Sequence, residues 1–375
     1  MQETLLLSDV VAPAPRHPVV GTQKDIRYYG STAKGVLNSP DTTGMPFWSI
    51  NPYVGCAFGC AYCYARFAHR FVMERAVAAA EADSPLTDDL TELPPWLAFE
   101  RRIFVKRNAA EVLRKTLRER GTSAAGAVQR GEPIVIGTAT DPYQPAERHF
   151  RVTRSVLEVL AEARRLRLTI ITKSPLITRD VDLLAQIAKR SSIRVHMSLI
   201  TLDRDLARRI EPRSPTPESR LRAVRRLRQA GIDVGVNIMP VLPGITDRPD
   251  ALTALVKRIA AEGATHINPA ALRLRSSARK RYLPFLATEF PSLAERYAAA
   301  YANEHEMPPA YREGLAKFMK RVCADAGIQY GSSYDRDERG RQLEPTLGPE
   351  YEEGSSPVPA APLPAPGIPQ LEFIL

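Results

Sequence analysis

Short runs of apolar residues alternate with amphipathic stretches through the middle of the chain. The apolar runs have the length of buried strands and cover residues 133–137, 168–172, 193–199, 234–241 and 266–274. Between them, apolar residues recur at helical spacing over residues 155–165, 180–190, 218–230 and 251–262. Strand followed by helix, repeated in this way, predicts right-handed βαβ units in a parallel sheet. With the extended run at 47–53 the pattern gives six units, which fit either a partial barrel or a doubly wound open sheet.

The two ends of the chain lack this alternation. Residues 1–40 are polar and contain Pro13, Pro15 and Pro18, so we expect an irregular arm there. After residue 275 the pattern becomes helical over 282–290, 292–301 and 311–326, and it predicts a C-terminal helical extension. From residue 335 the chain is acidic and rich in proline, which is typical of disordered segments. The expected division is an arm at 1–40, a core at 41–275, an extension at 276–334 and a tail at 335–375.

Charge is distributed unevenly along the chain. The 375 residues carry a net charge of +10 at pH 7. Residues 336–375 hold three Arg and seven Asp or Glu, a net of −4, so residues 1–335 carry +14. Nine arginines lie between residues 204 and 228. Such a basic field favours polyanionic partners, including nucleic acid and phosphorylated small molecules, although arginine-rich helices also form solvated faces.

The sequence also bears on the cellular compartment. No run of 18 or more apolar residues predicts a membrane span, so we expect no membrane partner. The N-terminus lacks the basic and apolar regions of a signal peptide. Only four cysteines are present, which is typical of a reducing compartment. We therefore expect a cytoplasmic protein.

Three of the four cysteines lie within eight residues. Cys56, Cys60 and Cys63 have the spacing C-x3-C-x2-C, and Tyr62 directly precedes the last of them. Thiols this close together do not fit one regular element, so they must line a tight loop. Such a loop suits a [4Fe–4S] cluster, in which three thiolates leave one of the four irons open for a substrate or cosubstrate.

Other assignments of the cysteine triplet remain open. A structural zinc site normally uses two ligand pairs, and the six histidines offer no second pair at ligand spacing. His69 is a candidate fourth zinc ligand, but the chain would have to bend back into the loop. A closed electron-transfer cluster is a further alternative. A disulfide would leave an odd cysteine.

Polar motifs follow the predicted strands one after another. In a parallel α/β barrel the loops after the strands gather at one mouth. The cysteine loop follows the first strand, and the motifs after the next four strands are residues 137–145, 172–174, 198–201 and 237–240. We therefore expect these motifs to converge on one site.

Several of these motifs carry a family resemblance. The cysteine loop with Tyr62 resembles the signature of radical S-adenosylmethionine (SAM) enzymes. The wider context is similar to the spore photoproduct lyase-related, DNA repair photolyase-like branch and its actinobacterial members of unassigned substrate. The motifs that carry the resemblance are NPYVGC (51–56), CYAR (63–66), TDPYQPAE (140–147), TKSP (172–175), LD (202–203), EP (211–212) and PGITD (243–247). The resemblance implies a partial (β/α)6 TIM-like barrel with a C-terminal helical extension.

The resemblance also implies a reaction. Cys56, Cys60 and Cys63 would hold a [4Fe–4S] cluster, and SAM would bind its open iron. A one-electron donor such as flavodoxin or ferredoxin would reduce the cluster, and cleavage of SAM would give a 5′-deoxyadenosyl radical that abstracts hydrogen from a substrate. The enzyme would then be a lyase or would carry out another radical-based modification.

Further residues receive roles from the same resemblance. Tyr62 would pack near the adenine of SAM, and Thr138, Thr140 and Asp141 stand where the motif for the SAM amino group is expected. Lys173 would pair with the SAM carboxylate or a substrate phosphate, with a plain salt bridge as the alternative. The remaining candidates for SAM contacts are two polar residues at strand ends, Ser198 and Asn237.

One departure from the family pattern affects the substrate. Spore photoproduct lyase chemistry would call for a barrel cysteine that returns hydrogen to the product radical. No cysteine lies between Cys63 and Cys323, and Cys323 falls in the predicted extension. The lyase reaction is therefore disfavoured, and Tyr64 or Tyr143 are alternative radical relays.

The sequence therefore predicts a radical SAM enzyme that acts on an unidentified substrate, with nucleic acid or another phosphorylated molecule favoured by the charge. A peptide substrate is a further possibility. An alternative from a different class is a non-catalytic Fe–S or zinc protein that binds nucleic acid. Formation of 5′-deoxyadenosine separates the two classes.

Overall fold

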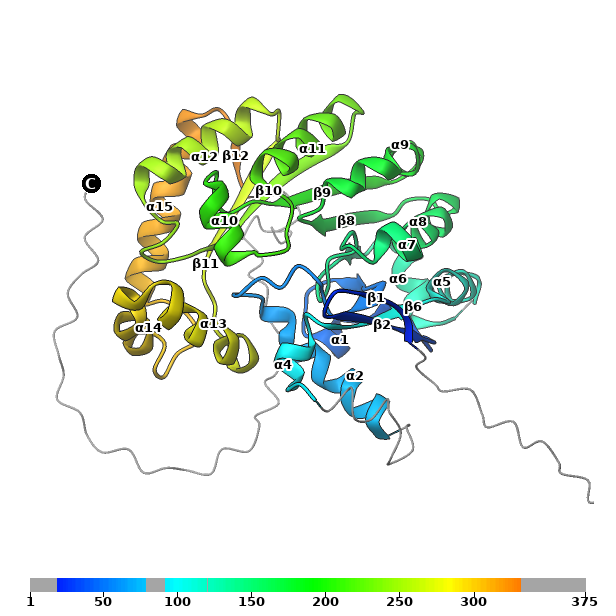
Figure 1. Ribbon diagram of the computed structural model, residues 1–375. Helices are drawn as coiled ribbons and strands as arrows, with labels where there is room; N and C mark the ends of the chain where they lie inside the picture. The colour runs from blue at the N-terminus through cyan, green and yellow to red at the C-terminus, as the bar shows by residue number, and fades with distance from the viewer. Residues whose placement is uncertain (1–18, 79–91, 120, 332–375) are drawn as a thin grey trace, which may run out of the picture.

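The main sheet forms the frame of the molecule. The computed structural model describes residues 19–78, 92–119 and 121–331 (Figure 1). Its eight-stranded sheet has the order β3-β4-β7-β8-β9-β10-β11-β12. Six neighbouring strands run parallel: β4 (Trp48–Ile50), β7 (Pro133–Ile136), β8 (Arg167–Thr172), β9 (Ser192–Ser198), β10 (Asp233–Val241) and β11 (His266–Ala271).

The order of these strands decides between the two predicted architectures. Each parallel strand pairs with the next one along the chain, so the order never reverses. A doubly wound sheet needs such a reversal. The fold is therefore the predicted partial (β/α)6 barrel.

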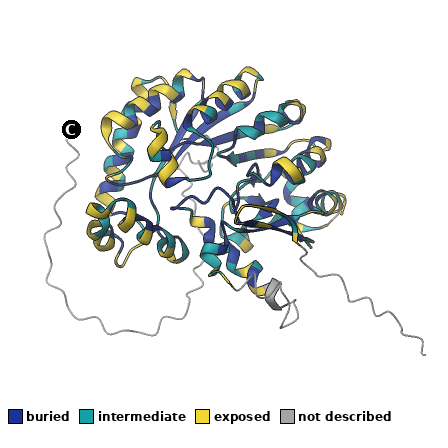
Figure 2. Cartoon of the chain, viewed as in Figure 1, coloured by how far each residue is buried: buried dark blue, intermediate teal, exposed yellow. Residues whose placement is uncertain are grey.

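Helices cover the outer face of the parallel strands. The four helices α8 (Val152–Glu162), α9 (Val181–Ala188), α11 (Pro217–Gln229) and α12 (Pro249–Ala261) follow β7, β8, β9 and β10. Figure 2 shows the strands largely buried and the helices buried along one face only. The buried side of α8, with Val156, Leu157 and Leu160, follows the helical spacing of apolar residues.

Shorter helices connect the remaining segments. Around the first strands they are α1 (Pro40–Thr43), η1 (Tyr64–Arg66), α2 (Phe67–Ala78), α4 (Pro95–Ala98), α5 (Ala109–Arg118) and α6 (Ser123–Gln129). Further along they are α7 (Glu147–Phe150), η2 (Pro175–Asp180) and α10 (Arg204–Ile210). No helix in the described residues is long and apolar enough to cross a bilayer.

A second, four-stranded sheet was not expected. It has the order β1-β2-β6-β5, with β1 (Val19–Gln23), β2 (Ile26–Ser31), β6 (Arg102–Lys106) and β5 (Tyr53–Val54). The expectation of an irregular arm is therefore wrong for residues 19–38, where β3 (Leu37–Asn38) also forms. The strand β2 pairs with β6 from a distant part of the chain, and its buried Tyr29 stacks on Phe104 of β6 with ring centroids 5.4 Å apart. The earlier part of the arm, residues 1–18, lies outside the described residues.

The C-terminal extension is helical, as predicted, and it joins the barrel edge. It contains α13 (Ser276–Glu289), η3 (Pro291–Leu293), α14 (Ala294–Ala300), α15 (Pro309–Asp325) and β12 (Gln329–Tyr330). The last strand pairs with β11, and the Tyr297 and Tyr301 hydroxyls donate to the carbonyls of Pro243 and Leu272. Cys323 is buried in the core on α15. The predicted acidic tail at 335–375 lies outside the described residues.

Candidate active site at the barrel mouth

The cysteine loop begins where the chain leaves β5, at the edge reached by the carboxyl ends of the parallel strands. Two glycines shape it. The backbone of Gly55 has φ +84°, and a Cβ there would lie 2.7 Å from the carbonyl oxygen of Phe99. At Gly59, with φ +66°, a Cβ would lie 2.5 Å from a guanidinium nitrogen of Arg213. Only glycine fits both places without strain.

The loop after β7 supports the cysteine loop from one side. The side chain of Gln144 donates to the Gly55 carbonyl at 3.1 Å and accepts from the Ala57 N–H at 2.9 Å. The hydroxyl of Thr140 donates to the same Gly55 carbonyl at 2.6 Å. These bonds pair the backbone of the cysteine loop with a neighbouring strand end, so the loop is held in one conformation.

Arginines support the loop from the other side. Arg66 donates to the Cys60 carbonyl at 2.8 Å and forms a buried ion pair with Glu100 at 2.6 Å. Arg213 donates from Nε to the Ala57 carbonyl at 2.5 Å. From α13, Arg281 approaches Glu100 at 3.8 Å, and burial together with repulsion by the other two guanidiniums lowers its pKa. The extension therefore contributes a charge directly behind the cysteine loop.

The three thiols are neighbours in a buried setting. Cys56 and Cys60 are buried and Cys63 is partly buried. Burial raises the pKa of the Cys56 thiol, and the charges of Asp141, Cys60 and Cys63 raise it further. Burial also raises the pKa of Cys60 to about 11, against the opposing effect of Lys173. Each of these thiols thus affects the charge of its neighbour, and a metal centre bound by their thiolates would draw off their protons.

This donor set fits an iron–sulfur cluster. Within residues 19–78, 92–119 and 121–331, no group of three or more His, Cys, Asp or Glu side chains is placed to hold one metal ion. A cluster has no such requirement, because each thiolate binds a different iron. His69, the candidate fourth zinc ligand, packs against two aromatic rings. Its ring centroid lies 5.9 Å from that of Phe99 and 5.7 Å from that of Phe104, and burial lowers its pKa to about 3.

A buried charge network lies next to the thiols. The carboxylate of Glu211 accepts short hydrogen bonds from the Tyr62 hydroxyl and from Arg220. Lys173 Nζ lies 4.0 Å from Glu211 and 5.6 Å from the centre of the Tyr62 ring. Ser214, on the following loop, places its Oγ 3.6 Å from Cys60 Sγ. Lys173 also lies near enough to Cys60 for its charge to oppose the rise in the pKa of that thiol.

The predicted residues of the β7 loop are brought to the same mouth, but their oxygens are engaged. Asp141 accepts from Thr172 Oγ1 and from the Lys173 and Tyr143 N–H groups, at 2.7–2.8 Å. Burial raises the pKa of Asp141, and these bonds oppose the rise. The hydroxyl of Thr138 accepts from Asn51 Nδ2 at 3.1 Å. Asp141 therefore ties the β7 loop to the end of β8.

The two candidate tyrosines lie in different surroundings. Tyr64 follows Cys63, is 38% exposed and donates its hydroxyl to the carbonyl of Thr138. Tyr143 is buried, and burial raises the pKa of its phenol, with further increases from Asp180 and Glu147. Tyr64 thus bridges the cysteine loop and the β7 loop, whereas Tyr143 lies in the packing beneath.

A polar layer crosses the inside of the barrel. Ser198, Asn237 and Asn268 stand in register on β9, β10 and β11, and Asn268 Nδ2 donates to Asn237 Oδ1 at 3.0 Å. Two residues earlier on β9 and β11, His196 and His266 meet at 3.0 Å between their Nε2 atoms. Both predicted strand-end residues therefore lie in the barrel interior.

Sequence reasoning missed Glu211, Arg220 and Asn268. Glu211 and Pro212 form one of the motifs given above, but the sequence alone indicates no partner for the Glu211 carboxylate. Asn268 occupies a strand position matching that of Asn237, which strand alignment would have revealed. Arg220 stands among nine arginines, and only its burial to 1% exposure distinguishes it.

A parallel partial barrel, with three cysteines in the loop after its first strand and a charged, buried network beside them, defines an α/β barrel protein whose polar groups gather at one mouth. The family model of the radical SAM superfamily matches residues 50–255. The chain belongs to the radical SAM superfamily and is an enzyme.

Relatives and solved structures agree with this membership. An uncharacterized protein of Mycobacterium tuberculosis is 35% identical over 301 residues, which cover 80% of this chain and 81% of that protein. A protein of Pseudomonas phage M6 named radical SAM Nalpha-GlyT isomerase is 24% identical over 76% of this chain and 53% of its own length. The fold is similar to that of a spore photoproduct lyase complexed with dinucleoside spore photoproduct, at a TM-score of 0.53, 13% identity and 81% coverage of both chains. The resemblance seen in the sequence is thereby confirmed.

Proposed function

We propose that Cys56, Cys60 and Cys63 bind a [4Fe–4S] cluster that leaves one iron open to SAM. The observation that supports this most is the set of three adjoining thiols in a loop fixed on both sides at the barrel mouth. When bound, the cluster and SAM would supply a 5′-deoxyadenosyl radical that abstracts hydrogen from the substrate. The protein would hold the cluster and SAM in position, place charged side chains beside them and exclude water from the barrel mouth.

The charged groups at the mouth suit SAM. Lys173 is only partly offset by Glu211 at 4.0 Å, so its ammonium group is suited to the SAM carboxylate. Tyr62 is held by Glu211 beside Lys173, where its ring can border the adenine. The interior residues Ser198 and Asn237 offer hydrogen bonds to the ribose or carboxylate.

The β7 loop has a supporting role in this proposal. Thr138 presents its carbonyl and hydroxyl near Tyr64, beside the proposed site of the SAM amino group. Thr140 and Asp141 hold the β7 loop in place and do not contact SAM themselves, because the Thr140 hydroxyl bonds the cysteine loop and the Asp141 carboxylate bonds the end of β8.

The substrate is proposed to be a nucleic acid or another phosphorylated molecule. The charge of +14 over residues 1–335 supports this, and the similar spore photoproduct lyase was solved with a dinucleoside. Cys323 is buried on α15, so we do not assign it the return of hydrogen to a product radical. Tyr64, exposed beside Cys63, is the better placed relay, with Tyr143 second.

The remaining assignments follow from the same chemistry. The enzyme needs a one-electron donor such as flavodoxin or ferredoxin. Four free cysteines and an oxygen-sensitive cluster suit a reducing cytoplasm. We also retain the division into a core at 41–275, an extension at 276–334 and a tail at 335–375.

Anaerobic reconstitution tests the proposal. The protein should take up about four irons per chain and form 5′-deoxyadenosine from SAM under a strong reductant. Cys56→Ala, Cys60→Ala and Cys63→Ala should each abolish product formation, whereas the matched control Cys323→Ala should not. Unchanged SAM cleavage after Cys60→Ala would contradict the assignment.

A further inference from the structure

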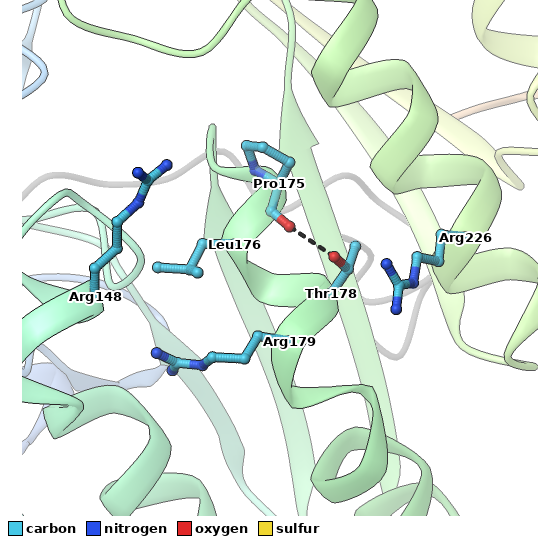
Figure 3. Close-up of a pocket in the computed structure, with 6 residues that line it drawn as sticks. All are labelled: Arg148, Pro175, Leu176, Thr178, Arg179 and Arg226. Atoms are coloured by element: carbon cyan, nitrogen blue, oxygen red, sulfur yellow. Dashed lines mark hydrogen bonds between the residues drawn. The ribbon is translucent and has the colours of Figure 1, made fainter.

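A hollow of about 360 Å³ lies beside the end of β8. Its lining residues, drawn in Figure 3, are Arg148, Pro175, Leu176, Thr178, Arg179 and Arg226. They come from three elements that adjoin the mouth. The helix α7 follows the supporting β7 loop, η2 begins directly after Ser174, and α11 carries the buried Arg220.

One of the three arginines is fixed and its charge is offset. Arg179 Nη2 lies 2.7 Å from Glu147 and 2.8 Å from Asp180, and both carboxylates are fully buried. Arg179 itself is 23% exposed. It therefore presents a rigid guanidinium edge to the hollow but adds little net charge.

The other two arginines are exposed. Among the described parts of the chain, neither Arg148 nor Arg226 has a carboxylate within ion-pair distance. In Figure 3, Arg226 points from α11 toward Thr178, and Arg148 lies on the other side of that residue. Two positive side chains that border one hollow make its lining attractive to an anion.

The rest of the lining indicates what carries the anion. Pro175 and Leu176 form an apolar part of the wall. Thr178 donates its hydroxyl to the Pro175 carbonyl at 2.9 Å, which fixes the η2 turn. A bare inorganic anion would leave the apolar part unused, whereas a sugar attached to a phosphate would cover it.

We propose that this hollow binds a sugar-phosphate unit of the substrate. Arg148 and Arg226 contact the phosphate, Arg179 orients it, and Pro175 and Leu176 pack against the sugar. This inference rests on the proposed function, since the rest of the substrate must reach the adjacent mouth. The unit belongs either to a polynucleotide strand or to a small sugar phosphate, and the experiment separates the two.

The test measures binding of a short, fluorescent, single-stranded oligonucleotide to the reconstituted protein between 50 and 200 mM salt, about the range over which such contacts respond strongly. Arg148→Gln and Arg226→Gln should each reduce the slope of log K against log salt by about 0.7, the value for one lost phosphate contact on a single strand. Arg226→Lys should retain the slope. The matched control is Arg222→Gln, one turn earlier on α11, exposed and outside the hollow.

The outcomes are distinct. Equal weakening by Arg222→Gln and Arg226→Gln overturns the proposal. So does a failure of Arg148→Gln and Arg226→Gln to change the binding of either probe, the oligonucleotide or ribose 5-phosphate. Arg226-dependent binding of ribose 5-phosphate without Arg226-dependent oligonucleotide binding supports the hollow and identifies a small sugar phosphate as its source. Formation of 5′-deoxyadenosine by the unsubstituted protein, with neither probe present, reports the proposed function separately.

Discussion

Replacing Glu211 with Gln removes a buried charge while keeping the shape of the side chain. Glu211 is 1% exposed and bonds Tyr62 and Arg220, with Lys173 at 4.0 Å. Loss of one partner from a buried ion pair costs about 3–5 kcal/mol, because the other charge stays buried without compensation. Arg220 keeps its bonds to the carbonyls of Pro215 and Ser198, so we expect the lower end, about 3 kcal/mol.

Urea unfolding of the cluster-free, reduced protein measures this loss. The exposed Glu295→Gln serves as the control and should change the free energy of unfolding by less than about 0.5 kcal/mol. The double variant Glu211→Gln, Arg220→Gln should lose less than the sum of the single losses, since the two groups interact. Additive losses, or a Glu211→Gln protein as stable as the control, would refute the reasoning.

The same variant has a predicted pH signature. Burial alone would raise the pKa of Glu211, but attraction by Arg220 and Lys173 outweighs it and lowers the pKa. A carboxyl with a lowered folded-state pKa stabilises the protein above its unfolded pKa of about 4.3, and this stabilisation is lost as the pH falls through the folded value. The stability gap between the unsubstituted protein and Glu211→Gln should therefore narrow on acidification below about pH 4.3. A gap that stays constant would contradict the ion pair.

Three further substitutions, two of them with a second variant for comparison, test the packing and hydrogen bonding inside the barrel and around the cysteine loop. Gly59→Ala should lower the free energy of unfolding by about 1–2 kcal/mol, because its backbone is left-handed, and it should also lower the iron bound per chain. The comparison variant is Gly314→Ala, which has open space around it inside α15 and should raise the free energy of unfolding by up to about 1 kcal/mol in the same urea assay. Gly235→Ala places a Cβ against the ring of His266 and should destabilise by about 1–3 kcal/mol, with partial rescue by His266→Ala; no rescue would argue against this clash. Asp141→Asn turns a carboxylate oxygen, which accepts from the Lys173 N–H at 2.7 Å, into an amide donor. The β7 loop would lose this bond, so the KM for SAM should rise. An unchanged KM would contradict the proposed place of the β7 loop at the SAM site.

Local patterns predicted most of the barrel. The apolar run at 168–172 became β8 (Arg167–Thr172), and the run at 234–241 became β10 (Asp233–Val241), because buried strands with amphipathic helices between them leave a strong periodic signal. The cysteine spacing likewise marked the loop at the mouth. These features need only neighbours in the chain to be recognised.

The missed features depend on partners far apart in sequence. Tyr62 and Glu211 are 149 residues apart, and no spacing rule pairs them. Arg281 reaches Glu100 only because the extension returns to the barrel edge. On β2, Tyr29 likewise stacks on Phe104 of β6, 75 residues further along the chain. In each case the fold must be known before the contact can be inferred.

The central claim is that Cys56, Cys60 and Cys63 hold a cluster with one iron open to SAM. The most direct measurement is the electron paramagnetic resonance spectrum of the reconstituted, reduced protein, recorded without and with SAM. We expect a reduced [4Fe–4S] signal that changes shape when SAM is added and is absent in Cys60→Ala. A cluster signal that SAM leaves unchanged, or that survives in Cys60→Ala, would contradict it.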